Sequence, residues 1–204
     1  MPTTALSETR PSPPRATIAE WLAQPEERGA ELIRGKLVYK ALPSAAHGRA
    51  QGKLYAQLDP YDRRPSGAGK PGGWWLSLEV DIELAGEGVR PDLVGWRRSR
   101  VPALPRAEPG KAITERPDWI CEVLSPTTAS RDLGEKLVVY HRAEVTHYWI
   151  VDPLNQTLTV YRWTADGYIV ALGCGGQMTV RAEPFSDLEI PIGVLFEDAS
   201  PGEG

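Results

Sequence analysis

Within residues 74–84, hydrophobic and polar residues alternate strictly after the two tryptophans: Leu76, Leu78, Val80, Ile82 and Leu84 are separated by Ser77, Glu79, Asp81 and Glu83. This period of two predicts a strand with one solvent-facing side. Residues 118–124 and 147–152 are instead nearly continuous apolar runs, which are typical of strands covered on both faces. Further short strands are predicted at 31–40 (a pair around a turn at 34–36), 89–96, 158–163, 168–173 and 177–182.

A helix is predicted between the two apolar strands, over residues 125–145, with Ser130 as a candidate N-cap. Leu133, Leu137 and Tyr140 are spaced to form its buried stripe. A strand, a crossover helix and a second strand pair in parallel, whereas the flanking hairpins are antiparallel. The sequence therefore predicts an α/β fold with a central mixed β-sheet flanked by a few helices.

Two other helices are expected nearer the N-terminus. Thr17 and Glu20 have the spacing of a capping box at the start of residues 17–24. Ser44 is a good N-cap for residues 44–58. The segment after residue 184 is expected to be partly helical at best.

The chain has 204 residues, 41% of them hydrophobic, and a net charge of -4. These values fit one domain and exclude disorder of the whole chain. We expect a disordered tail at 1–16, a single domain at 17–198 and a flexible tail at 199–204. The two cysteines lack zinc-ligand spacing and suit a reducing cytosol. Because there is no long apolar run and no signal-peptide pattern, a cytoplasmic protein without a membrane partner is expected.

Glu122 and Asp92 are the candidate metal ligands. Glu122 lies in the apolar run at 118–124, where an unpaired carboxylate would be costly. It needs either a structural ion pair, for example with an arginine, or a place at the strand end where the sheet opens for a ligand. Asp92 can simply end a turn, but beside Glu122 it would supply a second hard oxygen ligand for Mg²⁺ or Mn²⁺.

Lys136 is the third candidate residue. On an ideal helix it lies at the border of the stripe formed by Leu133, Leu137 and Tyr140. It could reach back over the strand ends toward the carboxylates. The alternative is a lysine whose stem covers the core while its amine meets water.

The segments PDLVGW, EVLSPTTASRDLGEKLVVY and HYWIVDP, with a closing VYR, together resemble the Uma-type family of putative restriction endonucleases, within the PD-(D/E)xK nuclease superfamily. The resemblance runs from about Glu31 to Phe196. Its most specific part lies between Asp118 and Pro153, where several of these segments occur together in order.

This resemblance implies a restriction-endonuclease-like core in which Asp92 and Glu122 hold Mg²⁺ (or Mn²⁺). The backbone carbonyl of Val123 would complete the metal ligands from the protein. The superfamily has a lysine two residues after the acidic ligand, but Leu124 stands there in this chain. Lys136 is the matching position on the following helix, and the resemblance implies that it orients the attacking water.

His47 matches a helix position that is often polar in the family. A contact to substrate or metal and an ordinary half-buried histidine are both open interpretations.

The activity implied is hydrolysis of DNA phosphodiester bonds by a metal-dependent endonuclease. By analogy with nucleases that cut both strands, we expect a homodimer. The alternative is a non-catalytic nucleic-acid-binding or protein-interaction module on a nuclease scaffold, which Leu124 and the acidic balance favour. A small-molecule hydrolase has less support, because no Ser/His/Asp or Cys/His arrangement stands out.

Basic residues concentrate in two Gly/Pro-rich segments, 61–75 and 97–111. Such loops can contact phosphates, and Trp74 and Trp75 could stack on bases. The simpler interpretation is that both segments are solvated loops and that the tryptophans pack in the core.

Overall fold

The computed structural model describes residues 14–63, 71–127 and 129–196. Its centre is a six-stranded sheet in the order β10-β9-β8-β7-β6-β3. All neighbours are antiparallel except β7 and β8, which are parallel, so the predicted mixed sheet is confirmed. The strands are β3 (Trp74–Leu78), β6 (Leu93–Arg97), β7 (Trp119–Val123), β8 (His147–Asp152), β9 (Thr157–Thr164) and β10 (Gly167–Gly175).

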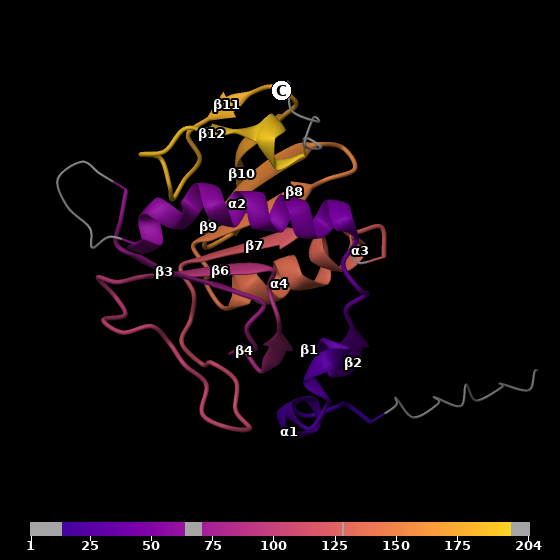
Figure 1. Cartoon of the computed structure of the whole chain (residues 1–204). Coiled ribbons are helices and arrows are strands. Elements are labelled where there is room, and N and C mark those ends of the chain that lie inside the picture. The colour runs from indigo at the N-terminus through magenta and orange to yellow at the C-terminus, as the bar shows by residue number, and fades with distance from the viewer. Residues whose placement is uncertain (1–13, 64–70, 128, 197–204) are drawn as a thin grey trace, which may run out of the picture.

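Helices α2 (Ala45–Arg63) and α4 (Glu135–Arg142) cover opposite faces of this sheet (Figure 1). Successive residues of β7 alternate between two cores, as the strand pleat requires. Trp119, Cys121 and Val123 join the core under α2, whereas Ile120 joins the core under α4. All five residues of β7 are buried, which confirms a strand covered on both sides.

A second, four-stranded sheet has the order β2-β1-β5-β4. Its strands are β1 (Ala30–Ile33), β2 (Lys36–Tyr39), β4 (Ile82–Leu84) and β5 (Glu87–Val89). Helix α1 (Ile18–Leu22) packs on β1 and β5. Further short elements are η1 (Glu26–Arg28), α3 (Ala129–Asp132), the pair β11 (Thr179–Val180) and β12 (Ile190–Pro191), and η2 (Ile192–Leu195).

The single strand predicted over 74–84 is wrong. The chain leaves the large sheet after Leu78 and joins the small sheet at Ile82, so β3 and β4 belong to different sheets. Glu79 has a φ of 48°, in the left-handed region that non-glycine residues rarely adopt. The alternation of side chains continues across this break and hides it from a pattern analysis.

The single helix predicted over 125–145 is also wrong. It divides into α3 (Ala129–Asp132) and α4, with Gly134 as the N-cap of α4 and Ser130 inside α3. The interruption changes the helical phase, so Leu133 is 47% exposed. The buried face of α4 consists of Lys136, Val139 and Tyr140.

Both predicted N-caps near the N-terminus are present. Thr17 and Glu20 form a reciprocal capping box. The hydroxyl of Ser44 accepts a hydrogen bond of 3.2 Å from the backbone N–H of His47, three residues on. Helix α2 continues five residues past the predicted end, and its Tyr61 is buried against Phe185.

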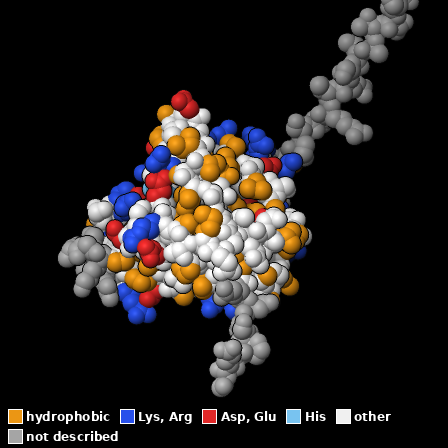
Figure 2. Space-filling model, turned by 90° about the horizontal axis from the view of Figure 1, so that it is seen from above, with side chains coloured by type: hydrophobic (Ala, Val, Ile, Leu, Met, Phe, Trp, Pro, Cys, Tyr) orange, Lys and Arg blue, Asp and Glu red, His pale blue; other side chains and the backbone are white. Residues whose placement is uncertain are grey.

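Most of the predicted tails (1–13 and 199–204) and residues 64–70, with the basic Arg64 and Lys70, lie outside the described residues. Within the described ranges, no helix combines the length and hydropathy that a bilayer-spanning segment needs. Figure 2 shows one face on which small groups of hydrophobic side chains lie among charges of both signs. The expected homodimer stays a prediction.

The cations of segment 97–111 mainly serve the fold. Arg100 pairs with Asp118 at 3.0 Å, and Arg98 lies 3.5 Å above the ring of Trp75. Trp74 is only 2% exposed, which confirms the interpretation that it packs in the core and excludes the alternative that it stacks on bases. Its ring packs against Phe185 in the core under α2.

Candidate active site

Asp92 and Glu122 come together where β6 and β7 adjoin. Leu93 pairs with Cys121 across these antiparallel strands, so Asp92 and Glu122 are the next opposite positions. The backbone N–H of Val123 donates to Oδ2 of Asp92 at 2.7 Å, which holds the two segments together. Both carboxylates line a cavity of about 500 Å³, to which η1, the segment 40–43 after β2, the start of α2 and α3 contribute residues.

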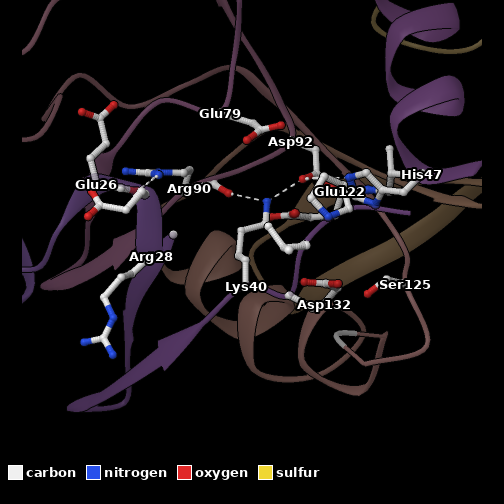
Figure 3. A pocket seen from close by; sticks show the side chains of 16 residues that line it. Glu26, Arg28, Lys40, His47, Glu79, Arg90, Asp92, Glu122, Ser125 and Asp132 are labelled. Carbon is white, nitrogen blue, oxygen red and sulfur yellow. Dashed lines mark hydrogen bonds and ion pairs between the residues drawn. The ribbon is translucent and has the colours of Figure 1, made fainter. Parts of the chain in front are cut away.

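Asp92 is held by two cationic or polar partners besides Val123. The Lys40 ammonium lies 2.5 Å from Oδ1, and Nε2 of His47 lies 3.5 Å from the same oxygen. Figure 3 shows the Lys40 amine between this carboxylate and the backbone carbonyl of Arg90. Burial by itself would raise the pKa of Asp92, but the contacts with His47 and Lys40 outweigh it and hold that pKa well below its usual range. Asp92 is therefore ionised at neutral pH.

Glu122 has a more enclosed environment and the opposite pKa shift. Its Oε1 accepts hydrogen bonds from Lys136 at 3.0 Å and from the Tyr140 hydroxyl at 2.5 Å. Burial raises the pKa of Glu122 to about 8, against the lowering effect of Lys136 and helped by the charge of Asp92. The buried partner of Glu122 is thus the Lys136 amine, and not the arginine considered from the sequence.

Lys136 is 1% exposed, so the interpretation that its amine meets water is wrong. Its Nζ lies 2.8 Å from Glu31, 3.0 Å from Glu122 and 3.3 Å from Asp132. We call these four residues the Lys136 cluster. Burial lowers the pKa of the Lys136 amine, but the surrounding carboxylates raise that pKa by more than burial lowers it, so the amine remains charged. An ammonium has three N–H donors, and three carboxylates surround this one.

Comparison with known proteins identifies the family. The family model Uma2, described as "Putative restriction endonuclease", matches residues 16–193. The chain belongs to the Uma2 family. No curated protein matches this Uma2 chain.

A solved structure of similar fold is the crystal structure of a putative nuclease belonging to DUF820 from Anabaena variabilis ATCC 29413. The two chains are 24% identical and superpose with a TM-score of 0.70, over 88% of this chain and 97% of the other. The fold of this Uma2 protein is therefore that of a solved nuclease-like protein.

The donor set of the Uma2 chain suits a hard divalent cation. Mg²⁺ is commonly bound through one or two carboxylates, with water and substrate phosphate completing its coordination. Asp92 is ionised and already holds a cation, the Lys40 ammonium, on Oδ1. The hydrogen bonds that described residues donate to the Glu122 carboxylate both end on Oε1, which leaves Oε2 for another ligand. In the described part of the chain no three His, Cys, Asp or Glu residues form a metal-binding group.

Two of the residues predicted from sequence lie where they could contribute. His47 is 7% exposed and lines the cavity with its Nε2 toward Asp92. Its Nδ1 is buried without a hydrogen-bond partner among the described residues. Val123 also lines the cavity, and metal coordination by its carbonyl stays a prediction.

Sequence analysis missed Lys40, Glu31, Gln51 and Glu79. Gln51 donates to Glu79 Oε1 at 3.1 Å and to the Asp92 carbonyl at 3.0 Å, so the turn at Glu79 is fastened beside the site. Glu31 lies in β1 and Lys40 directly follows β2, and no periodicity reveals how these strands of the small sheet pack on the large one. A signal was available for Glu31 alone, because it is a carboxylate in a strand that is otherwise apolar.

Proposed function

We propose that this Uma2 protein is a metal-dependent endonuclease that hydrolyses phosphodiester bonds of DNA. Asp92 and Glu122 are the proposed ligands of Mg²⁺ or Mn²⁺. The observation that carries the proposal is the convergence of these two carboxylates on one cavity, one strongly ionised and the other with an oxygen that receives no hydrogen bond from the described residues.

The bound metal would supply a Lewis acid that lowers the pKa of a water molecule and polarises a phosphoryl oxygen. In the reaction, the water oxygen forms a bond to phosphorus and the bond to the leaving oxygen breaks. The water loses one proton to solvent, and the leaving oxygen takes one up. The chain holds the two carboxylates in register through β6 and β7, and the N–H of Val123 fixes the orientation of Asp92.

The Lys136 cluster supports this site from behind. Lys136 and Tyr140 both donate to Oε1 of Glu122 and so orient its other oxygen. They also stabilise the ionised form of Glu122 that a metal requires. Direct orientation of the attacking water by Lys136 stays a prediction.

The test is cleavage of supercoiled plasmid DNA with Mg²⁺ or Mn²⁺ by the full chain and by Asp92→Asn. Asp166→Asn is the matched control, because Asp166 is an exposed aspartate in the turn between β9 and β10. We expect cleavage by the wild type and the control, and at least a ~100-fold loss in Asp92→Asn. Intact DNA after incubation with either metal, or equal cleavage by Asp92→Asn, would contradict the proposal. RNA of the same sequence establishes the preferred nucleic acid.

A non-catalytic nucleic-acid-binding module is the second candidate. It is favoured by the three carboxylates around the Lys136 ammonium, because no donor is left over for a water molecule. This candidate predicts DNA retention that falls with added salt and is unchanged in Glu122→Gln, with no cleavage by either protein.

A further inference from the structure

Two lysines flank the carboxylate pair, and only one of them lines the cavity. Lys136 lies behind Glu122 and is 1% exposed, whereas the Lys40 side chain is 16% exposed and forms part of the cavity wall. Lys40 follows the last residue of β2 and reaches Asp92 from the small sheet. The two amines therefore approach the site from different elements.

The hydrogen-bonding capacity of Lys40 is only partly used. Its Nζ contacts Oδ1 of Asp92 at 2.5 Å and the carbonyl oxygen of Arg90 at 3.1 Å. No third acceptor is present among the described residues, so one N–H remains for a molecule in the cavity. By contrast, carboxylates surround all three donors of Lys136.

The acidic lining of the cavity makes the remaining N–H donor of Lys40 important. Six carboxylates line the cavity, and a phosphodiester entering it would meet their negative charge; they are Glu26, Glu27, Glu79, Asp92, Glu122 and Asp132. The other basic side chains of the wall are engaged elsewhere. The guanidinium of Arg90 pairs with Asp81 at 2.8 Å, and that of Arg28 lies over the ring of Tyr39 at 5.1 Å. Lys40 is thus the wall ammonium that contacts the proposed metal ligand itself.

Lys40 and a divalent metal also compete for the same carboxylate. Oδ2 of Asp92 accepts a hydrogen bond from the backbone N–H of Val123, which fixes the orientation of the carboxylate. Oδ1 is the oxygen that Lys40 contacts at 2.5 Å, and a second cation bound to the same carboxylate would be repelled strongly by that ammonium. A metal held by Oδ1 would therefore displace the ammonium, which would remain tethered beside the site by its own side chain.

We propose that Lys40 is an exchangeable cation of this site: it neutralises Asp92 in the metal-free protein, gives up Oδ1 to the metal, and then donates a hydrogen bond to a non-bridging oxygen of the scissile phosphate. Lys40 donates hydrogen bonds only and transfers no proton. The inference rests on the proposed nuclease function, and it makes Lys40 a catalytic residue for that reaction.

The test compares Mn²⁺ binding and single-turnover DNA cleavage in the wild type and Lys40→Met. Removing the competing ammonium lowers the Kd for Mn²⁺ about tenfold, equal to about 1.4 kcal/mol. At saturating Mn²⁺ the same variant cleaves about 100-fold more slowly, because a donor to the reacting phosphate is lost. A purely structural lysine would not make metal binding tighter and cleavage slower at once.

Lys36→Met is the matched control, because Lys36 is an exposed lysine of β2, the strand that Lys40 follows, and does not line the cavity. It should leave both quantities unchanged. Lys40→Gln, which removes the charge but keeps an N–H donor, repeats the binding measurement if Lys40→Met fails to fold. Lys40→Arg keeps the charge and should keep the wild-type Kd.

An unchanged or higher Kd for Mn²⁺ in both Lys40→Met and Lys40→Gln, with a wild type that binds Mn²⁺ and cleaves DNA, overturns this inference alone. Tighter Mn²⁺ binding without slower cleavage overturns the phosphate contact. A wild type that neither binds Mn²⁺ nor cleaves DNA overturns the proposed function as well.

Discussion

Asp92 directly precedes β6 and lies opposite Glu122 of the neighbouring strand β7, yet the surroundings of the two carboxylates differ. Asp92 lies on the cavity wall with a partly exposed lysine and a histidine, and its pKa is lowered. Glu122 has the fully buried Lys136 cluster behind it, and its pKa is raised to about 8. The two carboxylates occupy equivalent backbone positions, so the difference comes from what contacts each one. Lys40, directly after β2, contacts Asp92, whereas Lys136 and Tyr140 of α4 contact Glu122.

This comparison separates two tasks that one lysine cannot perform together. A lysine enclosed by carboxylates holds them in place, because moving away would leave buried charges without a partner. A lysine at a cavity wall can exchange partners at low cost, because water is available to its amine. The structure assigns the first environment to Lys136 and the second to Lys40.

The largest expected effect on stability comes from the Lys136 cluster. Lys136→Met leaves the buried carboxylates of Glu31, Glu122 and Asp132 without their shared ammonium, so we expect a loss of about 3–5 kcal/mol in the free energy of unfolding. Urea denaturation in EDTA measures it. Adding Glu122→Gln to Lys136→Met should recover part of the loss, because one uncompensated charge is removed. A loss below about 1 kcal/mol would contradict the claim that carboxylates enclose the Lys136 ammonium.

Removing the lysine at the cavity wall, Lys40, should lower the free energy of unfolding by less than removing Lys136. Lys40→Met removes one partner of Asp92, but the N–H of Val123 and the ring of His47 remain. We expect a loss of about 2 kcal/mol in EDTA, measured by the same urea titration. The comparison between the two regions fails if Lys40→Met destabilises the protein as much as Lys136→Met does.

Tyr140→Phe tests the second donor to Glu122. The variant removes one hydrogen bond to Oε1 while Lys136 still holds that oxygen, so a loss of about 1 kcal/mol is expected. Tyr168→Phe is the control, because the Tyr168 hydroxyl donates to the backbone carbonyl of Val145, outside the site. Only Tyr140→Phe should also change the Mn²⁺ affinity.

The smallest expected effect concerns His147, which lies outside both regions and contributes to the loss of folding stability at acid pH. Burial lowers its pKa from the ordinary value of 6.5, so the folded protein binds this proton more weakly than the unfolded chain. Its stabilising contribution is present above pH 6.5 and is lost as the pH falls through the folded pKa. His147→Gln should therefore flatten the stability profile below pH 6.5, as followed by thermal unfolding in EDTA. An unchanged profile would mean that other groups cause the loss of stability at acid pH.

The central sheet and the carboxylate pair were predictable, and their surroundings were not. Continuous apolar runs identified β7 and β8, and a glutamate inside the first run drew attention to Glu122. The break at Glu79 was invisible, because side chains alternate on both sides of it. The role of Lys40 depends on how the small sheet packs over the large one, and no local pattern along the chain encodes that contact. The buried position of Lys136 was missed because Gly134 resets the helical phase.

The most direct test of the account is the amount of Mn²⁺ bound per chain, counted by electron paramagnetic resonance. The proteins to compare are the wild type, Asp92→Asn, Glu122→Gln and the exposed control Asp166→Asn, each shown to be folded by circular dichroism. The account predicts bound Mn²⁺ in the wild type and the control, and loss of that binding in the two site variants. Equal binding by all four proteins, or none by the wild type, would contradict the claim that Asp92 and Glu122 form a metal site.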